Sequence, residues 1–325
     1  MTAPLPVSVA LCTCNGARYL PRQVRSICAQ EPPPREIVLS DDASDDGSVE
    51  AAQQALAGAP IDLVVLRNPE RLGVTRNFEQ AVRACRHELI ALSDQDDEWH
   101  PGRLRRMTEA FQARADLLLL HSDARLVDAQ GAPLGGTLFH ALKASRGELR
   151  RIHAGAAFDV FLHRNLATGA TTVFRRALLQ AALPFPPECV HDEWLGLIAA
   201  ATGGVDAIEE ALIDYRQHGG NQIGARRLSF AETVRKALSS RGTFHIDRAC
   251  KTRRLLERLE ALAGQVAPPT LEKVRAKLEH HTFRATLPAS RLARCAPVLR
   301  EALTGRYGRF GRGLRGVVRD LLEAV

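Results

Sequence analysis

Residues 89–97 read LIALSDQDD, an apolar run that leads directly into the carboxylates of Asp94, Asp96 and Asp97. The apolar run is typical of a buried strand. Carboxylates this close repel one another unless a cation or solvent compensates, and solvent access is limited at the end of a buried strand. Hard oxygen ligands suit Mg²⁺ or Mn²⁺. The segment therefore predicts a divalent cation site; the alternative is a solvated acidic turn before a helix that begins near Pro101.

The same alternation of apolar runs and helical patterns extends outward from this segment. Strands are expected at residues 7–11, 36–39, 61–66 and 88–92, and helices at residues 19–30, 48–57 and 75–85. This spacing predicts an α/β fold with a mostly parallel, doubly wound central sheet flanked by helices. In such sheets ligands bind beyond the carboxyl ends of the strands.

Polar residues follow three of the expected strands, so they are expected to converge on one edge of the sheet. Thr13 and Asn15 follow the first strand, and Asp41 and Asp42 end the second. The paired aspartates are consistent with a turn and helix cap, or with a carboxylate that accepts hydrogen bonds from a nucleobase or ribose. Arg76 precedes a helix, where it could serve a phosphate or belong to a simple loop-to-helix junction.

Two later clusters add candidate side chains. Residues 191–194 read HDEW at the start of an apolar helix. Acids in the first turn of a helix often only complement its dipole, but Asp192 is also a candidate general base toward an acceptor hydroxyl. Residues 214–221 read DYRQHGGN, in which Arg216 and His218 could meet a diphosphate or supply a metal ligand. The alternative for His218 is a structural role.

Charge divides the chain into two regions. Residues 226–325 contain 22 Lys and Arg against 9 Asp and Glu, whereas the preceding residues carry a net charge of −6. We therefore expect a catalytic domain at residues 1–225 and a basic, mainly helical region at residues 226–325. The seven scattered cysteines fit a reduced, cytoplasmic protein. We expect neither a signal peptide nor a transmembrane helix.

Taken in order, these motifs resemble glycosyltransferase family 2, the inverting enzymes of GT-A fold. The likeness covers roughly residues 5–225. The segments LSDQDDEW, HDEWL and YRQHGGN are similar to the rhamnosyltransferase-like branch, which builds bacterial surface polysaccharides. Two positions depart from the family pattern: Cys14 replaces a usual tyrosine, and Ala43 replaces the glycine after the paired aspartates. The Gln-x-x-Arg-Trp motif of processive synthases is absent, so addition of one or a few sugars is expected.

The resemblance implies a metal-dependent hexosyltransferase with Mg²⁺ or Mn²⁺ as cofactor. Its donor would be a dTDP-sugar such as dTDP-rhamnose, or a UDP-sugar, and its acceptor a saccharide or lipid-linked saccharide. Asp192 would be the general base, and Asp96 the direct ligand of the metal-binding DXD motif. The remaining predicted site residues are Thr13, Asn15, Asp41, Asp42, Arg76 and Asp94 for the nucleotide, Asp97 and His218 for the metal, and Trp99, His191, Glu193, Trp194 and Arg216 for the acceptor.

Several alternatives stay open at this stage. The basic region could hold the enzyme at the inner face of the anionic cell membrane, pack on the catalytic domain, or join two subunits in a homodimer. Nucleic acid is not expected as a partner, because the region is poor in stacking aromatics. Other function classes are a metal-dependent phosphohydrolase, whose nucleophile normally follows the first strand, and a non-catalytic nucleotide-sugar-binding subunit.

Overall fold

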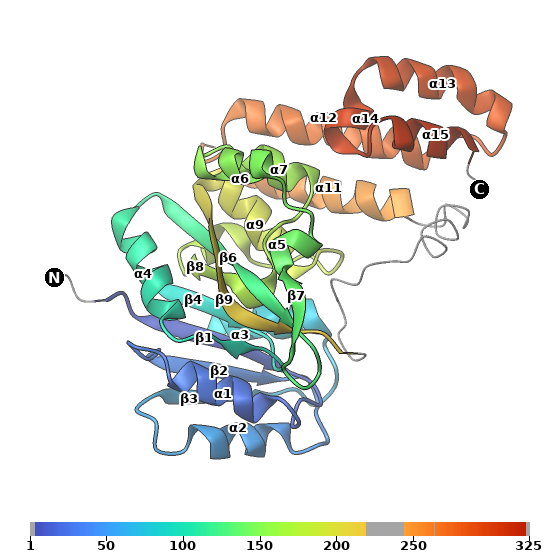
Figure 1. Ribbon diagram of the computed structural model, residues 1–325. Helices are drawn as coiled ribbons and strands as arrows, with labels where there is room; N and C mark the ends of the chain where they lie inside the picture. The colour runs from blue at the N-terminus through green and yellow to red at the C-terminus, as the bar shows by residue number, and fades with distance from the viewer. Residues whose placement is uncertain (1–3, 219–243, 263, 323–325) are drawn as a thin grey trace. The chain divides into compact units, whose positions relative to one another are not determined.

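Residues 7–93 fold as four parallel strands joined by three helices (Figure 1). The computed structural model describes residues 4–218, 244–262 and 264–322. The seven elements are β1 (Val7–Thr13), α1 (Leu20–Cys28), β2 (Glu36–Asp41), α2 (Ser48–Leu56), β3 (Asp62–Arg67), α3 (Val74–Ala84) and β4 (Leu89–Ser93). Strands β1, β2 and β4 are buried along their whole length, which explains why the sequence shows them as continuous apolar runs.

The second half of the sheet contains antiparallel pairs. The strand order is β3-β2-β1-β4-β8-β6-β9-β5, with β7 paired to β6. Strands β4 and β8, β8 and β6, β9 and β5, and β6 and β7 are antiparallel, whereas β6 and β9 are parallel. The strands are β5 (Glu98–Trp99), β6 (Leu117–Val127), β7 (Pro133–Thr137), β8 (Thr172–Arg175) and β9 (Gly204–Arg216). The expected α/β fold with helices around a central sheet is confirmed, but the sheet is mixed and not mostly parallel, because four of its described strand pairs are parallel and four are antiparallel.

Helices cover both faces of this sheet. Apolar residues of α1, α2 and α4 share one core with alternate residues of β1. Helix α3 packs against β1 and β2. It connects β3 to β4, a step that crosses the sheet in the opposite direction to the steps from β1 to β2 and from β2 to β3. A right-handed crossover therefore places α3 on the opposite face of the sheet from α1 and α2. The other helices of this part are α4 (Arg103–Ala113), α5 (Leu138–Ala141), α6 (Arg146–His153), α7 (Ala157–His163), η1 (Gly169–Thr171), α8 (Leu178–Ala182) and α9 (His191–Thr202).

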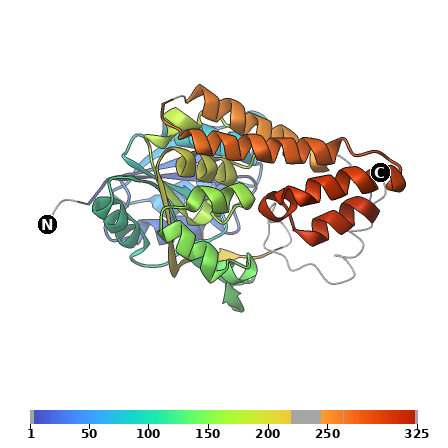
Figure 2. The same ribbon diagram turned by 90° about the horizontal axis from the view of Figure 1, so that it is seen from above.

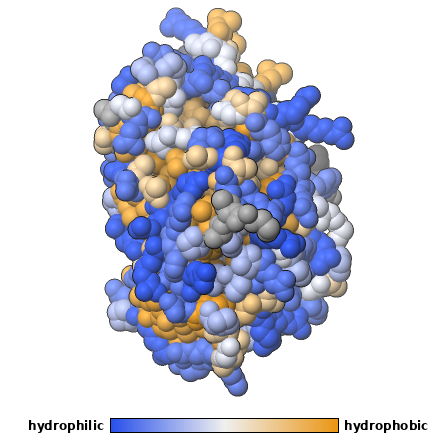
Figure 3. Space-filling model, turned by 90° about the vertical axis from the view of Figure 1, so that its left-hand side faces the viewer, coloured by the Kyte–Doolittle hydropathy of each residue, from blue (hydrophilic) through white to orange (hydrophobic). Residues whose placement is uncertain are grey.

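The strand register places the expected polar ends at one edge. Thr13 lies opposite Asp41, and Leu11 lies opposite Ser93, the last residue before the acidic loop. The carboxyl ends of β1, β2 and β4 therefore meet side by side, as the sequence predicted. Figure 3 shows a different face, where hydrophilic residues dominate and an apolar patch lies towards its lower end.

The chain separates into two compact units, Met1–Phe161 with Asn165–Ala225, and Leu162–Arg164 with Arg226–Val325. In the second unit α11 and α12 lie side by side (Figure 2), and three shorter helices follow. These elements are α11 (Phe244–Ala261), α12 (Pro268–Ala285), α13 (Arg291–Leu303), α14 (Arg306–Phe310) and α15 (Leu314–Leu322). Its described residues are mainly helical, as expected. Asp320, fully buried, accepts hydrogen bonds from Arg284 and Tyr307 at the centre of this unit.

Candidate active site

A cavity of about 300 Å³ lies at the carboxyl edge of β1, β2 and β4. It is lined by the loops that follow these strands and, from the other side, by the start of α9 and the residues around Gly169. The predicted site residues that line it are Thr13, Asn15, Asp42, Asp94, Asp96, His191 and Asp192. Segments more than a hundred residues apart in sequence thus meet at one cavity.

The paired aspartates at the end of β2, Asp41 and Asp42, differ in their hydrogen-bond partners. The Asp42 carboxylate accepts hydrogen bonds from the Asn68 side chain (3.1 Å) and from the backbone N–H groups of Leu72 (2.7 Å) and Gly73 (3.0 Å), so it fixes the loop before α3. Asp41 Oδ2 accepts from the Ser44 N–H. Asp41 Oδ1 is buried and has no partner among the described residues, and Asp41 itself does not line the cavity.

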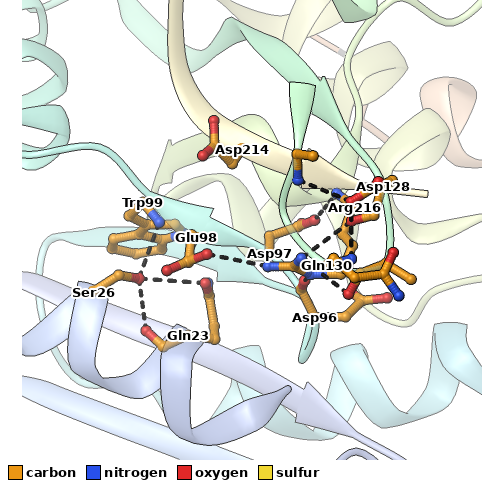
Figure 4. Close-up of polar contacts among 12 residues, drawn as sticks. Gln23, Ser26, Asp96, Asp97, Glu98, Trp99, Asp128, Gln130, Asp214 and Arg216 are labelled. Atoms are coloured by element: carbon orange, nitrogen blue, oxygen red, sulfur yellow. Dashed lines mark hydrogen bonds and ion pairs between the residues drawn. The ribbon is translucent and has the colours of Figure 1, made fainter. Parts of the chain in front are cut away.

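The acidic loop after β4 is held by Arg216 of β9 (Figure 4). The Arg216 backbone N–H donates to Asp97 Oδ1 (2.9 Å), and its Nε donates to the Asp96 carbonyl (2.7 Å). Its remaining guanidinium nitrogens reach Glu98 Oε2 (3.1 Å) and the Asp128 carbonyl (3.2 Å). Because Arg216 is only 1% exposed, its cation compensates the loop from inside the protein.

The loop nevertheless retains an excess of negative charge on the cavity side. Burial, followed by the nearby carboxylates of Asp96 and Asp192, raises the pKa of Asp94 to about 7. Burial, followed by the carboxylates of Asp96 and Asp94, raises the pKa of Asp97 well above its usual range. Asp97 Oδ2 is buried with no hydrogen-bond partner in the described chain. These carboxyl groups would be stabilised in their charged form by a cation in the cavity.

The donor set suits a divalent cation that is completed by substrate. Asp96 Oδ2 and His218 Nε2 lie 2.7 Å apart, and the His218 ring stacks on Tyr19. Among the described residues no three His, Cys, Asp or Glu side chains are already grouped as metal ligands. Mg²⁺ and Mn²⁺ sites in phosphate-transfer enzymes commonly use one or two protein ligands and fill the rest with phosphate oxygens and water. Asp96 and His218, with Asp94 and Asp97 nearby, fit that pattern.

Asp192 faces the acidic loop across the cavity. Its Oδ2 accepts from the Gly169 N–H (3.0 Å), and its Oδ1 accepts from Asn165 Nδ2 (3.2 Å). Burial raises the pKa of Asp192 to about 6, and the hydrogen bonds from Gly169 and Glu193 limit the increase. A carboxylate with a pKa near neutrality, held in place by three donors, has the properties of a general base.

His191 forms part of the cavity wall beside Asp192. Its ring stacks on Phe78 with centroids 4.0 Å apart. Burial lowers the pKa of His191 to about 3, so the ring is neutral. Neither ring nitrogen has a partner among the described residues. A Cβ on Gly169 would lie 2.8 Å from His191 Nε2, so the close contact between the His191 ring and the backbone at position 169 requires glycine there.

Eight predicted site residues are absent from the cavity lining. Asp41, Asp97 and His218 are described above, and the predicted ligand contacts of the other five need correction. Arg76 lines a separate, open hollow of about 610 Å³ beside α3 and pairs with Glu79 at 3.6 Å. Trp99 and Trp194 are core residues: the Arg103 guanidinium covers the Trp99 ring, and Trp194 Nε1 donates to the Ala182 carbonyl. Glu193 and Arg216 are also absent from the cavity lining. Aromatic and charged residues in these motifs serve packing and loop geometry.

Sequence reasoning missed several residues that shape the cavity. Arg71, five residues before Arg76, lines the cavity and supplies the cation expected there. Gln95 Oε1 accepts from the Thr13 hydroxyl and the Cys14 N–H, both at 2.8 Å. Gln95 was visible inside the acidic motif, but as an uncharged spacer. Asn165, which supports Asp192, lies in a segment that has no recognisable motif.

The comparisons with known proteins agree with this geometry. The sequence model described as "Glycosyl transferase family 2" matches residues 8–182, more than half of the chain. An uncharacterized glycosyltransferase of Nostoc sp. is 28% identical over 221 residues, 67% of this chain and 66% of the relative, so the match spans just under two thirds of that protein. A dTDP-rhamnosyl transferase, RfbG, of Shigella flexneri is 22% identical, with 66% of this chain and 74% of the relative covered.

Solved structures show the same fold. The TarS structure from S. aureus in complex with UDP-GlcNAc has a TM-score of 0.57 at 17% identity, covering 86% of this chain and 73% of that chain. The mannosyltransferase PcManGT from Pyrobaculum calidifontis, in complex with GDP-Man and Mn²⁺, has a TM-score of 0.53 at 20% identity, covering 85% and 70%. Both are GT-A glycosyltransferases. The chain therefore belongs to glycosyl transferase family 2 and is built on the GT-A fold.

Proposed function

We propose that this glycosyltransferase moves one sugar from a nucleotide-sugar donor to an acceptor hydroxyl with inversion at the anomeric carbon. One observation carries the proposal: a single cavity is lined both by Asp192, at the start of α9, and by Asp94 and Asp96 of the acidic loop. Inversion needs a base and a leaving group on opposite sides of the sugar. Asp192 would face the acceptor, and the acidic loop would face the diphosphate.

The transfer step is a single displacement. The acceptor oxygen forms a bond to the anomeric carbon, the bond from that carbon to the diphosphate oxygen breaks, and the acceptor proton passes to Asp192. The backbone N–H of Gly169 and the amide of Asn165 hold the Asp192 carboxylate in place. General-base assistance of this kind typically contributes about 10²–10⁴-fold in rate.

On the donor side, Asp41 and Arg71 would hold the nucleotide. Asp41 adjoins Asp42 of the cavity lining, and its buried Oδ1 has no partner in the described chain, so an N–H or O–H of a base or ribose would satisfy it. Arg71 brings a cation to the cavity. Asp96 and His218 would hold Mg²⁺ or Mn²⁺, with Asp94 and Asp97 supporting them. When bound, such a cation neutralises charge on the leaving diphosphate, an effect of several kcal/mol.

For the substrates we propose dTDP-rhamnose as donor, with a UDP-sugar as the alternative. The Shigella relative is named a dTDP-rhamnosyl transferase, whereas TarS binds UDP-GlcNAc. A saccharide or lipid-linked saccharide, extended during synthesis of a bacterial surface polysaccharide, is the proposed acceptor. A succinoglycan biosynthesis protein among the relatives supports this setting. Transfer of labelled sugar from a panel of dTDP-, UDP- and GDP-sugars would identify the donor.

The role of Asp192 is tested by Asp192→Asn. Donor binding, measured by isothermal titration, should stay within about twofold, while transfer should fall by about 10²-fold or more. Glu188→Gln is the matched control, because it makes the same neutral change outside the cavity lining. Transfer by Asp192→Asn at near the native rate would contradict the assignment of the base.

The metal role of Asp96 is tested by donor titration with and without Mn²⁺. The native chain should bind the donor more tightly with Mn²⁺, and Asp96→Ala should lose most of that difference. Binding of the native chain that is equally tight in the presence of a chelator would exclude the metal role. Donor binding without transfer to any acceptor would favour a non-catalytic nucleotide-sugar-binding subunit instead.

A further inference from the structure

Helix α13 has an apolar face that points away from its own unit. Its buried face consists of Arg294, Val298 and Glu301. Leu292, Leu299 and Leu303 recur at helical spacing on the other side, and Leu292 and Leu303 are 87% and 89% exposed. Exposed leucines arranged in a stripe differ from the isolated ones that any protein surface shows, and they mark an interaction site.

Helix α15 repeats this arrangement. Gly316, Val317 and Asp320 form its buried face. Leu314, Val318 and Leu322, spaced four residues apart, are exposed, Leu314 to 77%. The buried faces of α13 and α15 meet each other, because Arg294 of α13 donates to the Asp320 carbonyl. Both leucine stripes therefore lie on the outside of this helix pair.

The surface charge of the same helices has one sign. Residues 291–322 contain eight arginines and two acids. Both acids are buried and paired: Glu301 with Arg306, beside a hydrogen-bond contact with His280, and Asp320 with Arg284. The exposed arginines Arg291, Arg300, Arg312 and Arg315 form no ion pair with any described residue. This surface thus offers leucines and uncompensated arginines together.

We infer that the outer faces of α13 and α15 dock on the surface of an anionic lipid bilayer. Leucines can enter the acyl boundary while neighbouring arginines contact lipid phosphates, which is how amphipathic helices bind in the plane of a membrane. No helix in the described part of the chain is long and apolar enough to span the bilayer. A nucleic acid fits less well, because α13 and α15 contain no aromatic residue, and Tyr307 and Phe310 of α14, between them, are buried and cannot stack on bases.

The test uses the full chain and vesicles of two compositions. One contains only phosphatidylcholine, and the other contains about 30% phosphatidylglycerol. Co-sedimentation should show binding to the anionic vesicles that is at least about tenfold tighter than to the neutral ones. Binding should weaken when salt is raised to about 0.5 M, since screening reduces the attraction of exposed arginines.

Two variants separate the apolar and electrostatic contributions. Leu292→Ser, Leu299→Ser and Leu303→Ser combined should weaken binding to anionic vesicles about tenfold or more, because exposed leucines can be replaced without disturbing the core. Glutamine at Arg291, Arg300, Arg312 and Arg315 should have a comparable effect. The matched control replaces the same number of exposed arginines in the other unit, Arg35, Arg146, Arg150 and Arg176, and should bind as the native chain does.

Three outcomes would overturn the inference. The first is equal binding to neutral and anionic vesicles. The second is full binding by the triple leucine variant, with native thermal unfolding. The third is a native chain that ignores vesicles but becomes monomeric on leucine replacement, which would make the surface a contact between two copies. Because none of these measurements uses sugar transfer, failure here would leave the proposed enzymatic function untouched.

Discussion

The pH dependence of transfer should follow the ionisation of Asp192. Burial raises the pKa of this carboxyl to about 6, and only the ionised form can accept the acceptor proton. The rate should therefore rise with pH, with about a tenth of the base ionised at pH 5 and about nine tenths at pH 7. Because the shift raises the pKa, activity is lost as the pH falls through 6 and is full above it.

Replacing Asn165 should move this profile upward. Asn165 Nδ2 donates to Asp192 Oδ1 at 3.2 Å and so favours the ionised form. A hydrogen bond of this length is worth about 1 kcal/mol, and about 1.4 kcal/mol corresponds to one pKa unit. Asn165→Ala should therefore raise the midpoint by about 0.7 unit. At pH 6 the rate would fall from about half to about one sixth of its plateau, and at pH 8 it would change little.

The assay is kcat/KM for release of nucleoside diphosphate, measured between about pH 5 and 8.5 with saturating Mn²⁺. Gln53→Ala, which removes an exposed amide on α2, is the control and should keep the native profile. A plateau that falls while the midpoint stays in place would show that Asn165 only shapes the cavity. A native profile without an acid limb near pH 6 would refute Asp192 as the titrating base.

Two further predictions concern the loops that build the site. Ala43 has φ 56°, a left-handed conformation that favours glycine, so Ala43→Gly should raise the free energy of unfolding by up to about 1 kcal/mol after the entropy cost of glycine; a clear loss in urea denaturation would contradict this. Arg216→Met removes the guanidinium that holds the acidic loop and should lower stability by about 3 kcal/mol, with loss of donor binding. An unchanged urea midpoint would show that the acidic loop keeps its conformation without the Arg216 guanidinium.

Much of the fold could be predicted because its first half depends on local patterns. Strands such as Val7–Thr13 and Leu89–Ser93 are buried on both faces, so they read as continuous apolar runs. Parallel strands also need helical crossovers, whose apolar residues recur at the helical spacing of three to four residues. The antiparallel pairing of β4 with β8 joins residues 89–91 to residues 173–175, and no local pattern records a contact over that separation.

The candidate site divides in the same way. The sequence by itself determined the chemical groups and their edge of the sheet, because a carboxylate that follows a buried strand must emerge at the strand's carboxyl end. Asp94, Asp96 and Asp192 could be predicted on that basis and on family resemblance. Their side chains line one cavity.

Only the tertiary structure decided which residues face that cavity and which support it. From the sequence alone, Arg216 and Trp194 could contact either a ligand or the protein core. In the folded chain both are buried and bonded to distant segments, so they belong to the protein interior. Asn165 and Gly169 gained their importance only by meeting Asp192, more than twenty residues away. Hydrogen bonds and packing contacts between distant segments form only when the chain folds, so they cannot be read from local sequence patterns.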